Sequence, residues 1–245
     1  MRTLAISHQR DAGPGVFAEA IAAAGHELDL WLIPETGEPP ADPLGYDAVM
    51  TFGGAMHADQ PDRHPWIEPE KELLSELIAA GVPLLGVCLG SQLVVEAAGG
   101  EARRAPEPEI GWHRVELTTE GTEDPLLAPL APSFEAFQWH SYECVPPAGA
   151  AILARSPVCV QAFRVGSAWG IQSHPEVSAA DAAHWIDDYR SDSDAVRIGV
   201  DPASLGRETE GRIAAWNELG RGLCSRFLAA AEGDHLSSAR FSEEK

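Results

Sequence analysis

The chain has 245 residues, 44% of them hydrophobic, which is enough for the core of one large α/β domain or two small domains. Its formal net charge of −21, from 38 acidic against 17 basic residues, would repel a phosphate backbone and disfavours nucleic-acid binding. No run of about 18 apolar residues occurs and no signal peptide precedes the first strand-like run, so we expect a cytoplasmic protein without membrane contact.

The first half of the chain alternates strand-like with helix-like segments. Four short apolar runs are typical of buried strands: 4–7, 27–33, 48–52 and 82–87. Three segments have helical character and are each closed by a glycine: 14–24, 66–80 and 91–98. This order of elements predicts an α/β fold with a mostly parallel central sheet covered by helices on both faces.

The second half of the chain is richer in short strands separated by proline and glycine turns. We predict strands at 111–117, 134–140, 151–154, 158–165 and 168–173. They indicate a small antiparallel extension of the sheet rather than a separate domain. Helices are expected at 179–189 and 213–231, with a polar, loop-rich segment at 192–211 between them. The last residues, 233–245, are expected to form a flexible tail.

The segment Gly86-Val87-Cys88-Leu89-Gly90 joins an apolar strand to a helix. A nucleophile between two glycines in this context is typical of a tight elbow that holds the side chain above the sheet. The N-terminus of the following helix would favour the thiolate form of Cys88. The alternative interpretation is a buried cysteine in a glycine-rich turn. The other cysteines, Cys144, Cys159 and Cys224, form no CxxC pair, and we interpret them as small buried groups.

A second candidate lies at the end of the last strand, where His174-Pro175-Glu176 follows an apolar run. The proline fixes the local backbone, so both side chains can be held close together. His174 would accept the thiol proton of Cys88, and Glu176 would orient the imidazole and stabilise its charged form. A His-x-Glu pair seen alone is more often structural, so the prediction depends on its combination with the cysteine elbow.

A glycine pair, Gly53-Gly54, follows the third strand and would face the same edge of the sheet. The peptide N–H of Gly54, together with that of Leu89, could bind the oxyanion of a tetrahedral intermediate. The alternative is a simple tight turn.

Together these motifs resemble the class I, or triad, glutamine amidotransferases. The resemblance rests on Gly86–Gln92, on Ser173-His174-Pro175-Glu176 and on Phe52-Gly53-Gly54. It implies a flavodoxin-like sheet in a single domain over 1–232. It also implies that Gln92 and Gly53 contact the substrate, and that Trp139, His140 and Ser141 line the pocket. A packed strand-end histidine is an equal alternative for His140.

Flanking motifs, Glu109-Ile110-Gly111-Trp112 and Pro65-Trp66-Ile67, are similar to those of stand-alone members that resemble the glutaminase domain of GMP synthase. The resemblance implies that Cys88, His174 and Glu176 hydrolyse the glutamine side-chain amide through a γ-glutamyl thioester. No phosphate-cradling G-x-x-x-x-G-K-[ST] motif follows Glu176. If the ammonia is transferred to an acceptor, we therefore expect a partner synthetase chain to supply the acceptor site.

Two alternatives remain: a stand-alone hydrolase of γ-glutamyl amides or peptides, and a non-catalytic regulatory or binding module. We expect no cofactor. We also expect no metal site, because the remaining histidines lack a metal-ligand spacing. His57, Asp59 and His64 are better interpreted as part of a solvated loop.

Overall fold

The computed structural model describes residues 1–242, with side chains described through Gly233. Its nine-stranded sheet has the order β2-β1-β3-β4-β9-β8-β6-β5-β7. The strands are β1 (Arg2–Ser7), β2 (Glu27–Leu32), β3 (Ala48–Thr51), β4 (Leu84–Val87), β5 (Glu101–Leu117), β6 (Ser133–Val145), β7 (Ala151–Arg155), β8 (Val160–Val165) and β9 (Ala168–Ile171).

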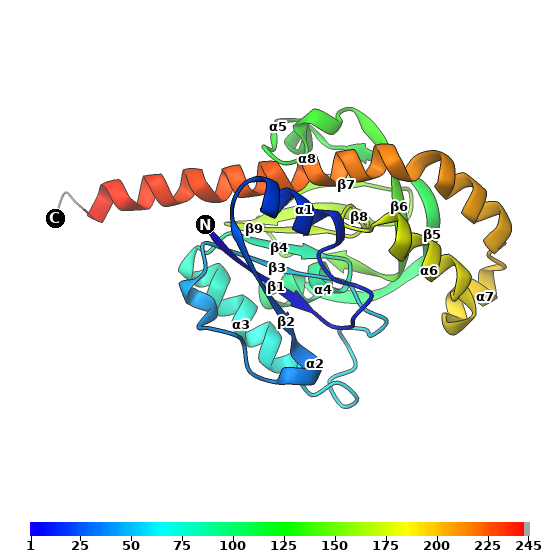
Figure 1. The fold of residues 1–245 in the computed structure, drawn as a ribbon, viewed down its shortest axis with the longest axis horizontal. Helices are drawn as coiled ribbons and strands as arrows, with labels where there is room; N and C mark the ends of the chain where they lie inside the picture. Colours follow the sequence, from blue (N-terminus) through cyan, green and yellow to red (C-terminus); the bar gives the residue numbers. More distant parts are fainter. Residues whose placement is uncertain (243–245) are drawn as a thin grey trace.

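The described residues also form eight α-helices and three short 3-10 turns (Figure 1). The α-helices are α1 (Gly15–Ala23), α2 (Ile33–Thr36), α3 (Ile67–Ala80), α4 (Leu89–Ala97), α5 (Thr119–Glu123), α6 (Ala179–Asp187), α7 (Ser193–Ile198) and α8 (Pro202–Ser242). The 3-10 turns are Pro43–Gly45, Ala128–Leu130 and Tyr189–Ser191. No described helix combines the length and apolar character that a bilayer crossing needs.

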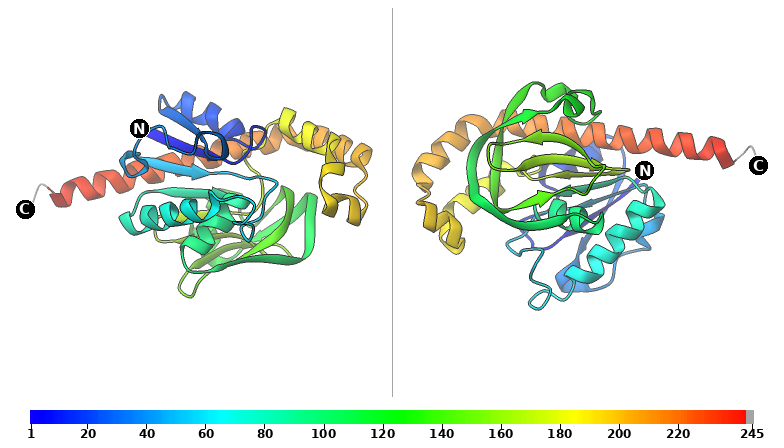
Figure 2. Two further views of the ribbon diagram at one scale, coloured as in Figure 1. Left: turned by 90° about the horizontal axis from the view of Figure 1, so that it is seen from below. Right: turned by 180° about the vertical axis from the view of Figure 1, so that it is seen from behind.

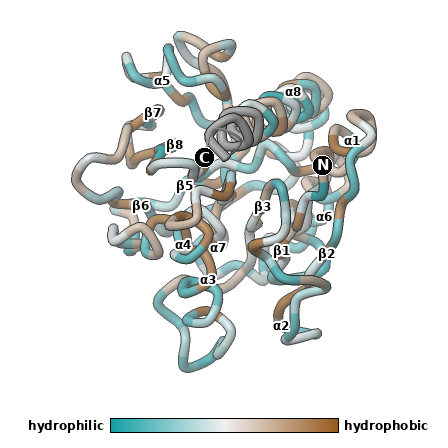
Figure 3. Tube along the Cα trace, turned by 90° about the vertical axis from the view of Figure 1, so that its left-hand side faces the viewer, coloured by the Kyte–Doolittle hydropathy of each residue, from teal (hydrophilic) through white to brown (hydrophobic). Residues whose placement is uncertain are grey.

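The first part of the sheet is parallel. Strands β2, β1, β3, β4 and β9 pair in that order, each parallel to its neighbour. Alternate residues of β1 face opposite layers of the core, since Leu4 and Ile6 pack with one cluster and Ala5 with the other. Helices α1 and α8 cover one face and α3 and α4 the other (Figure 3). The prediction of an α/β fold with helices on both faces is confirmed for this part.

The second part of the sheet is antiparallel and much larger than the sequence suggested. Strand β5 has 17 residues and β6 has 13, and they pair along most of their length. Strand β7 pairs with both β5 and β8, which closes β8, β6, β5 and β7 into a ring. Figure 2 shows the long green strands curving around this ring. The prediction of a mostly parallel, flavodoxin-like sheet with only a small antiparallel extension is therefore wrong in its proportions.

Residues 192–211, which were expected to form a loop, are mostly helical. Helix α7 begins after Asp192, whose carboxylate accepts hydrogen bonds from the N–H groups of Asp194 and Ala195. Helix α8 begins at Pro202, a residue that suits the first turn of a helix, and continues to Ser242. Its backbone is thus helical over part of the segment expected to be a tail. Residues 243–245 lie outside the described residues.

Candidate active site

The turn from β4 into α4 holds Cys88 in a conformation that side chains rarely adopt. Cys88 has φ 52° and ψ −111°, and it is the only non-glycine residue with positive φ among residues 1–242. Its backbone N–H donates to Ile171 O at 2.8 Å, and its carbonyl accepts from the Ser91 hydroxyl at 2.7 Å. These bonds fix a turn whose backbone angles are unfavourable. The predicted elbow is confirmed as a local structure.

The two glycines of the elbow allow close packing rather than flexibility. A Cβ at Gly90 would lie 2.0 Å from Thr51 O, and one at Gly86 would lie 2.6 Å from Gly90 O. The N–H of Gly90 instead donates to Phe52 O at 2.9 Å. Helix α4 is thereby joined to the end of β3, so the Cys88 turn and the Gly53-Gly54 turn lie beside each other.

His174 and Glu176 lie just beyond the end of β9, the strand next to β4. Glu176 Oε1 is 2.8 Å from His174 Nδ1, and both side chains are almost completely buried. The backbone of His174 is fixed by its N–H to Phe137 O at 3.0 Å and by the Trp216 indole N–H, which donates to His174 O at 2.8 Å. Because Nδ1 is engaged by Glu176, Nε2 is the ring nitrogen left for another partner.

Cys88 lies beside this imidazole, because Gly53 is adjacent to both side chains. The sulfur is one of the groups that act on the pKa of His174. Burial alone would lower the pKa of His174, but Cys88 and then Glu176 outweigh it and raise that pKa to about 10. Cys88 and Glu176 therefore favour the imidazolium form of His174, and a cation next to a thiol is an arrangement that activates cysteine nucleophiles in general.

The Gly53-Gly54 turn lies directly against these groups. A Cβ at Gly53 would lie 3.0 Å from His174 Cε1 and 3.7 Å from Cys88 Cβ. The N–H of Gly54 has no backbone acceptor among the described residues. Leu89 is the first residue of α4, where N–H groups have no partner within the helix. Both N–H groups are thus available at the end of the sheet that carries Cys88.

A buried ion pair that the motif-based prediction missed supports this turn. His8 Nδ1 donates to Gly53 O at 3.1 Å, and His8 Nε2 is 2.9 Å from Glu70 Oε2. Burial alone would lower the pKa of His8, yet Glu70 and the Gly53 carbonyl raise it. Thr51 donates to the other oxygen of Glu70 at 2.7 Å. The position of His8 directly after the first predicted strand was a usable signal, because strand ends of a parallel sheet meet at one edge.

A cavity of about 380 Å³ opens above Cys88. Several predicted site residues line it: Gly54, Cys88, Leu89, Gln92, Trp139, His140, Ser141 and His174. Gly53 and Glu176 are not in its wall; Gly53 lies against His174 Cε1 and Glu176 against His174 Nδ1. The structure therefore brings all the predicted residues to one region but separates those that reach the cavity from those that support it.

The cavity wall also contains residues that the sequence did not indicate. Asp192 accepts from the Trp139 indole N–H at 3.0 Å, and Asp194 accepts from Arg104 at 2.6 Å. His57, expected in a solvated loop, stacks on Tyr142 with ring centroids 4.2 Å apart and lines the cavity. These contacts join segments up to 90 residues apart in the chain, which no local motif could have revealed.

The position of His140 favours the packed-histidine alternative. Its Nδ1 is 2.9 Å from Tyr142 O, and its Nε2 is 3.3 Å from Glu109 Oε2. Only 5% of the residue is exposed. The residue lines the cavity, while both of its ring nitrogens lie close to other protein atoms, Tyr142 O and Glu109 Oε2.

Comparisons with known proteins agree with one another. Residues 15–188 match the sequence model of the family described as glutamine amidotransferase class I. A γ-glutamyl-L-1-hydroxyisopropylamide hydrolase from Pseudomonas sp. is 33% identical over 155 residues, which cover 59% of this chain and 52% of that protein. A glutamine-hydrolysing GMP synthase subunit from Sulfurisphaera tokodaii is 34% identical over 147 residues, 58% of this chain and 74% of the relative.

Among solved structures, a glutamine amidotransferase from Thermotoga maritima superimposes with a TM-score of 0.84 at 27% identity. The match covers 93% of this chain and 97% of that one. The chain spans only about half the length of the Pseudomonas relative.

Proposed function

The chain belongs to the class I glutamine amidotransferase family and is an enzyme, and we propose that Cys88, His174 and Glu176 hydrolyse a γ-glutamyl amide bond. One observation carries this proposal. A cysteine in a strained strand-to-helix turn interacts with a buried imidazole, whose other nitrogen is 2.8 Å from a carboxylate, at the floor of a cavity. This is the arrangement of nucleophile, base and orienting group.

In the proposed reaction, the Cys88 thiolate attacks the γ-carboxamide carbon of the substrate. A carbon–sulfur bond forms, and the carbonyl oxygen becomes an oxyanion that accepts hydrogen bonds from the N–H groups of Gly54 and Leu89. His174, already protonated, donates its proton to the departing nitrogen as the carbon–nitrogen bond breaks. A γ-glutamyl thioester remains on Cys88, and an amine or ammonia is released.

Hydrolysis of the thioester completes the cycle. His174, now neutral, accepts a proton from a water molecule that attacks the thioester carbonyl. The γ-glutamyl carboxylate leaves and the Cys88 thiolate is regenerated. Glu176 keeps the imidazole in one orientation through both steps and stabilises its cation. No cofactor is required by this scheme.

Glutamine is the first candidate substrate, with Gln92, Trp139 and Ser141 as contacts for the part of the molecule beyond the amide. Similarity to a GMP synthase subunit supports glutamine, and with it a partner synthetase chain that accepts the ammonia. Similarity to a γ-glutamyl-amide hydrolase favours the second candidate, direct hydrolysis of a γ-glutamyl conjugate without a partner. A cavity of about 380 Å³ is large enough for a group on the amide nitrogen.

An assay of product release separates these candidates from each other and from a non-catalytic module. Glutamine and a series of N-alkyl γ-glutamyl amides are incubated with the protein, and glutamate is quantified. Turnover of glutamine with ammonia release supports the glutaminase proposal, and turnover of only the N-alkyl amides supports the conjugate hydrolase. Both are refuted, in favour of a non-catalytic module, if wild type and Cys88→Ala give the same background rate with every substrate.

We further propose that residues 1–232 act as one domain in a reducing, cytoplasmic setting. Cys88, Cys144, Cys159 and Cys224 are all free thiols, and each is buried. The acidic surface charge disfavours nucleic-acid partners.

A further inference from the structure

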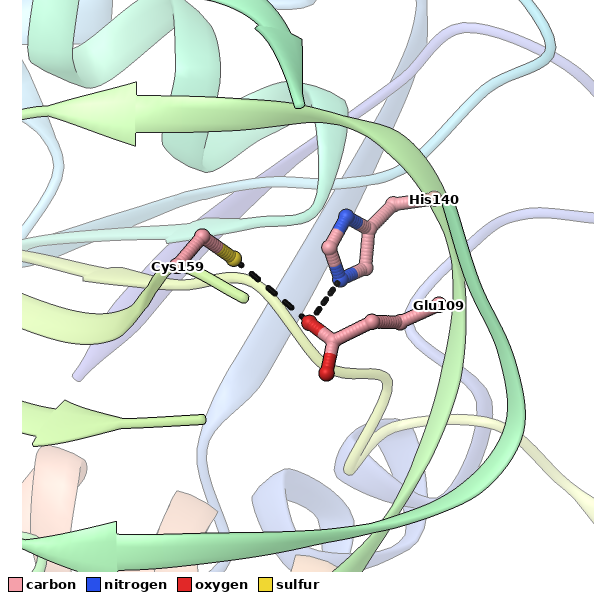
Figure 4. Close-up of side chains that lie close together, drawn as sticks. All are labelled: Glu109, His140 and Cys159. Carbon is pink, nitrogen blue, oxygen red and sulfur yellow. Dashed lines mark hydrogen bonds and ion pairs between the residues drawn. The ribbon is translucent and has the colours of Figure 1, made fainter. Parts of the chain in front are cut away.

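A second cluster of reactive side chains lies in the antiparallel ring, apart from Cys88. Glu109 on β5, His140 on β6 and Cys159 in the turn before β8 point toward one another (Figure 4). Their ligand atoms all lie within 4.8 Å of one another. The residues are only 1%, 5% and 6% exposed, respectively. A carboxylate, an imidazole and a thiol therefore share one dry site that the proposed reaction does not use.

The hydrogen bonds of His140 leave one ring nitrogen aimed into this cluster. Nδ1 is 2.9 Å from Tyr142 O, and because a carbonyl oxygen can only accept, Nδ1 carries the proton. In the neutral ring, Nε2 then has a lone pair directed toward Glu109 and Cys159. Nε2 is 3.3 Å from Glu109 Oε2, yet it has no hydrogen-bond partner among the described residues. A buried nitrogen without a partner requires an explanation.

Two of the three distances between the ligand atoms match a tetrahedral metal ion, and the third is within 4.8 Å. With bonds of about 2.0 Å to nitrogen and oxygen and about 2.3 Å to sulfur, tetrahedral angles separate N from O by about 3.3 Å and S from O by about 3.5 Å. The observed distances are 3.3 Å from His140 Nε2 to Glu109 Oε2 and 3.5 Å from Cys159 Sγ to Glu109 Oε2. A thiol hydrogen bond would also give the second distance, but it leaves Nε2 unsatisfied.

The surrounding residues hold the three side chains in place. Glu109 and His140 are directly opposite each other in the β5–β6 ladder, so their side chains share one face. The Ser156 hydroxyl accepts the N–H groups of Val158 and Cys159 at 3.2 and 3.1 Å, which fixes the turn that carries the thiol. Such rigid support, together with a backbone carbonyl on the far nitrogen of the histidine, is typical of metal ligands.

One further side chain supports the carboxylate and the sulfur together. Gln161 Nε2 is 2.7 Å from Glu109 Oε2 and 3.4 Å from Cys159 Sγ. An amide N–H donates well to an anionic oxygen and to a thiolate. Without a cation, burial and the neighbouring Glu109 carboxylate raise the pKa of the Cys159 thiol, so the thiolate needs the charge of a bound metal ion to form.

We propose that Glu109 Oε2, His140 Nε2 and Cys159 Sγ bind a divalent cation of the zinc type. Nitrogen, oxygen and thiolate sulfur together are the donor set that zinc accepts in proteins. The fourth coordination position would be filled by the Ser156 hydroxyl, which is 3.0 Å from Glu109 Oε2, or by a water molecule. On binding, the Cys159 thiol loses its proton to solvent and a sulfur–metal bond forms.

Such an ion would join β5, β6 and the β7–β8 turn at the closure of the antiparallel ring. It would also fix the strand segment Trp139-His140-Ser141, which borders the cavity. The ion would act on the position of the cavity wall and take no part in the chemistry at Cys88. This inference does not depend on the proposed hydrolytic reaction, so each can fail without the other.

The test replaces the metal with Co²⁺, whose bonds to thiolate give a charge-transfer absorption. Purified protein is freed of metal with a chelator, dialysed and titrated with Zn²⁺ and Co²⁺. Wild type is expected to bind about one ion per chain and to show the thiolate–cobalt band. Cys159→Ser should lose that band and bind at least about 100-fold more weakly. Cys88→Ala and Cys224→Ser, which change buried thiols outside the cluster, should retain both properties.

If Cys159→Ser does not fold, the Cys88→Ala protein provides a second test. Any thiolate–cobalt band in the Cys88→Ala protein must come from Cys144, Cys159 or Cys224. Adding Glu109→Gln to this protein should abolish the band. The proposal is overturned if folded wild type binds no ion with a thiolate band, or if the band survives Cys159→Ser. The cluster would then be a metal-free group of packed side chains.

Discussion

The parallel and antiparallel parts of the sheet contribute to the active site in different ways. In the parallel part, each functional group follows a short strand: the Gly53-Gly54 turn follows β3, Cys88 follows β4 and His174 follows β9. In the antiparallel part, Trp139 and Ser141 lie within β6 and face the cavity from the side. In the proposed reaction, the parallel part therefore supplies the reacting groups, and the antiparallel part supplies walls of the cavity.

The largest expected effect comes from the base. His174→Ala should lower kcat by about 10⁴–10⁶-fold, since the proton acceptor and the cation that favours the thiolate are both lost. Steady-state kinetics with the best substrate measure the effect, and circular dichroism checks that the fold is retained. Near-normal turnover in a folded variant would contradict the proposal that the parallel part of the sheet supplies the reacting groups.

Glu176→Gln should lower kcat by about 10³–10⁴-fold, because the amide cannot stabilise the imidazolium in the same way. KM should change little, since Glu176 lies behind the imidazole and outside the cavity wall. A variant with unchanged kcat and raised KM would place Glu176 among the substrate contacts instead. Glu210→Gln, on an α8 residue outside the cavity, is a control for the loss of one charge.

Trp139→Ala tests the antiparallel part. It should raise KM by about tenfold or more and leave kcat within a few-fold of wild type, because it removes binding surface without touching the reacting atoms. Trp139→Phe is the matched variant: it keeps the ring surface and removes only the N–H that donates to Asp192. A fall in kcat at unchanged KM would show that the antiparallel part acts on the chemical step.

Glu70→Ala tests the support of the Gly53-Gly54 turn. It leaves the buried His8 without its carboxylate partner and should lower the free energy of unfolding by about 3–5 kcal/mol. Urea unfolding measures this change. Glu72→Ala, at an exposed position on the same helix, should be nearly neutral. An equal effect of both substitutions would mean that the His8–Glu70 pair has no special role.

The raised pKa of His174 predicts that the stability of the fold depends on pH. Because the folded-state pKa, about 10, is above the unfolded value of about 6.5, the contribution is fully present below pH ~6.5. It is lost as the pH rises through about 10. The difference in unfolding free energy between wild type and His174→Gln should therefore shrink from pH 6 to pH 10. A difference that stays constant would contradict the charged imidazole.

Much of the parallel part could be predicted from the sequence because its signals are local. Gly86-Val87-Cys88-Leu89-Gly90 contains its strand end, its turn and its helix start within a few residues, and both glycines are needed for close packing. Glu176 is two residues from His174, so their contact could be inferred from spacing. The family resemblance then supplied the roles of residues that local patterns leave open.

The antiparallel part could not be predicted in this way because its contacts are distant in the chain. Glu109 meets His140 and Cys159 only through the β5–β6 ladder and the ring closure by β7 and β8. The long β5 contains two prolines and a register shift, which give its first half the pattern of a loop. Asp192 and Asp194 reach the cavity through a short helix that lacks a clear apolar periodicity.

The most direct test of the proposed chemistry is to trap the acyl-enzyme. Wild type is mixed with glutamine or the best γ-glutamyl amide, quenched in acid within milliseconds to seconds, digested and mapped by mass spectrometry. A γ-glutamyl adduct should appear on the peptide containing Cys88 and be absent from Cys88→Ala. Turnover without any adduct on Cys88, or an adduct on a different residue, would contradict the assignment of Cys88 as the nucleophile.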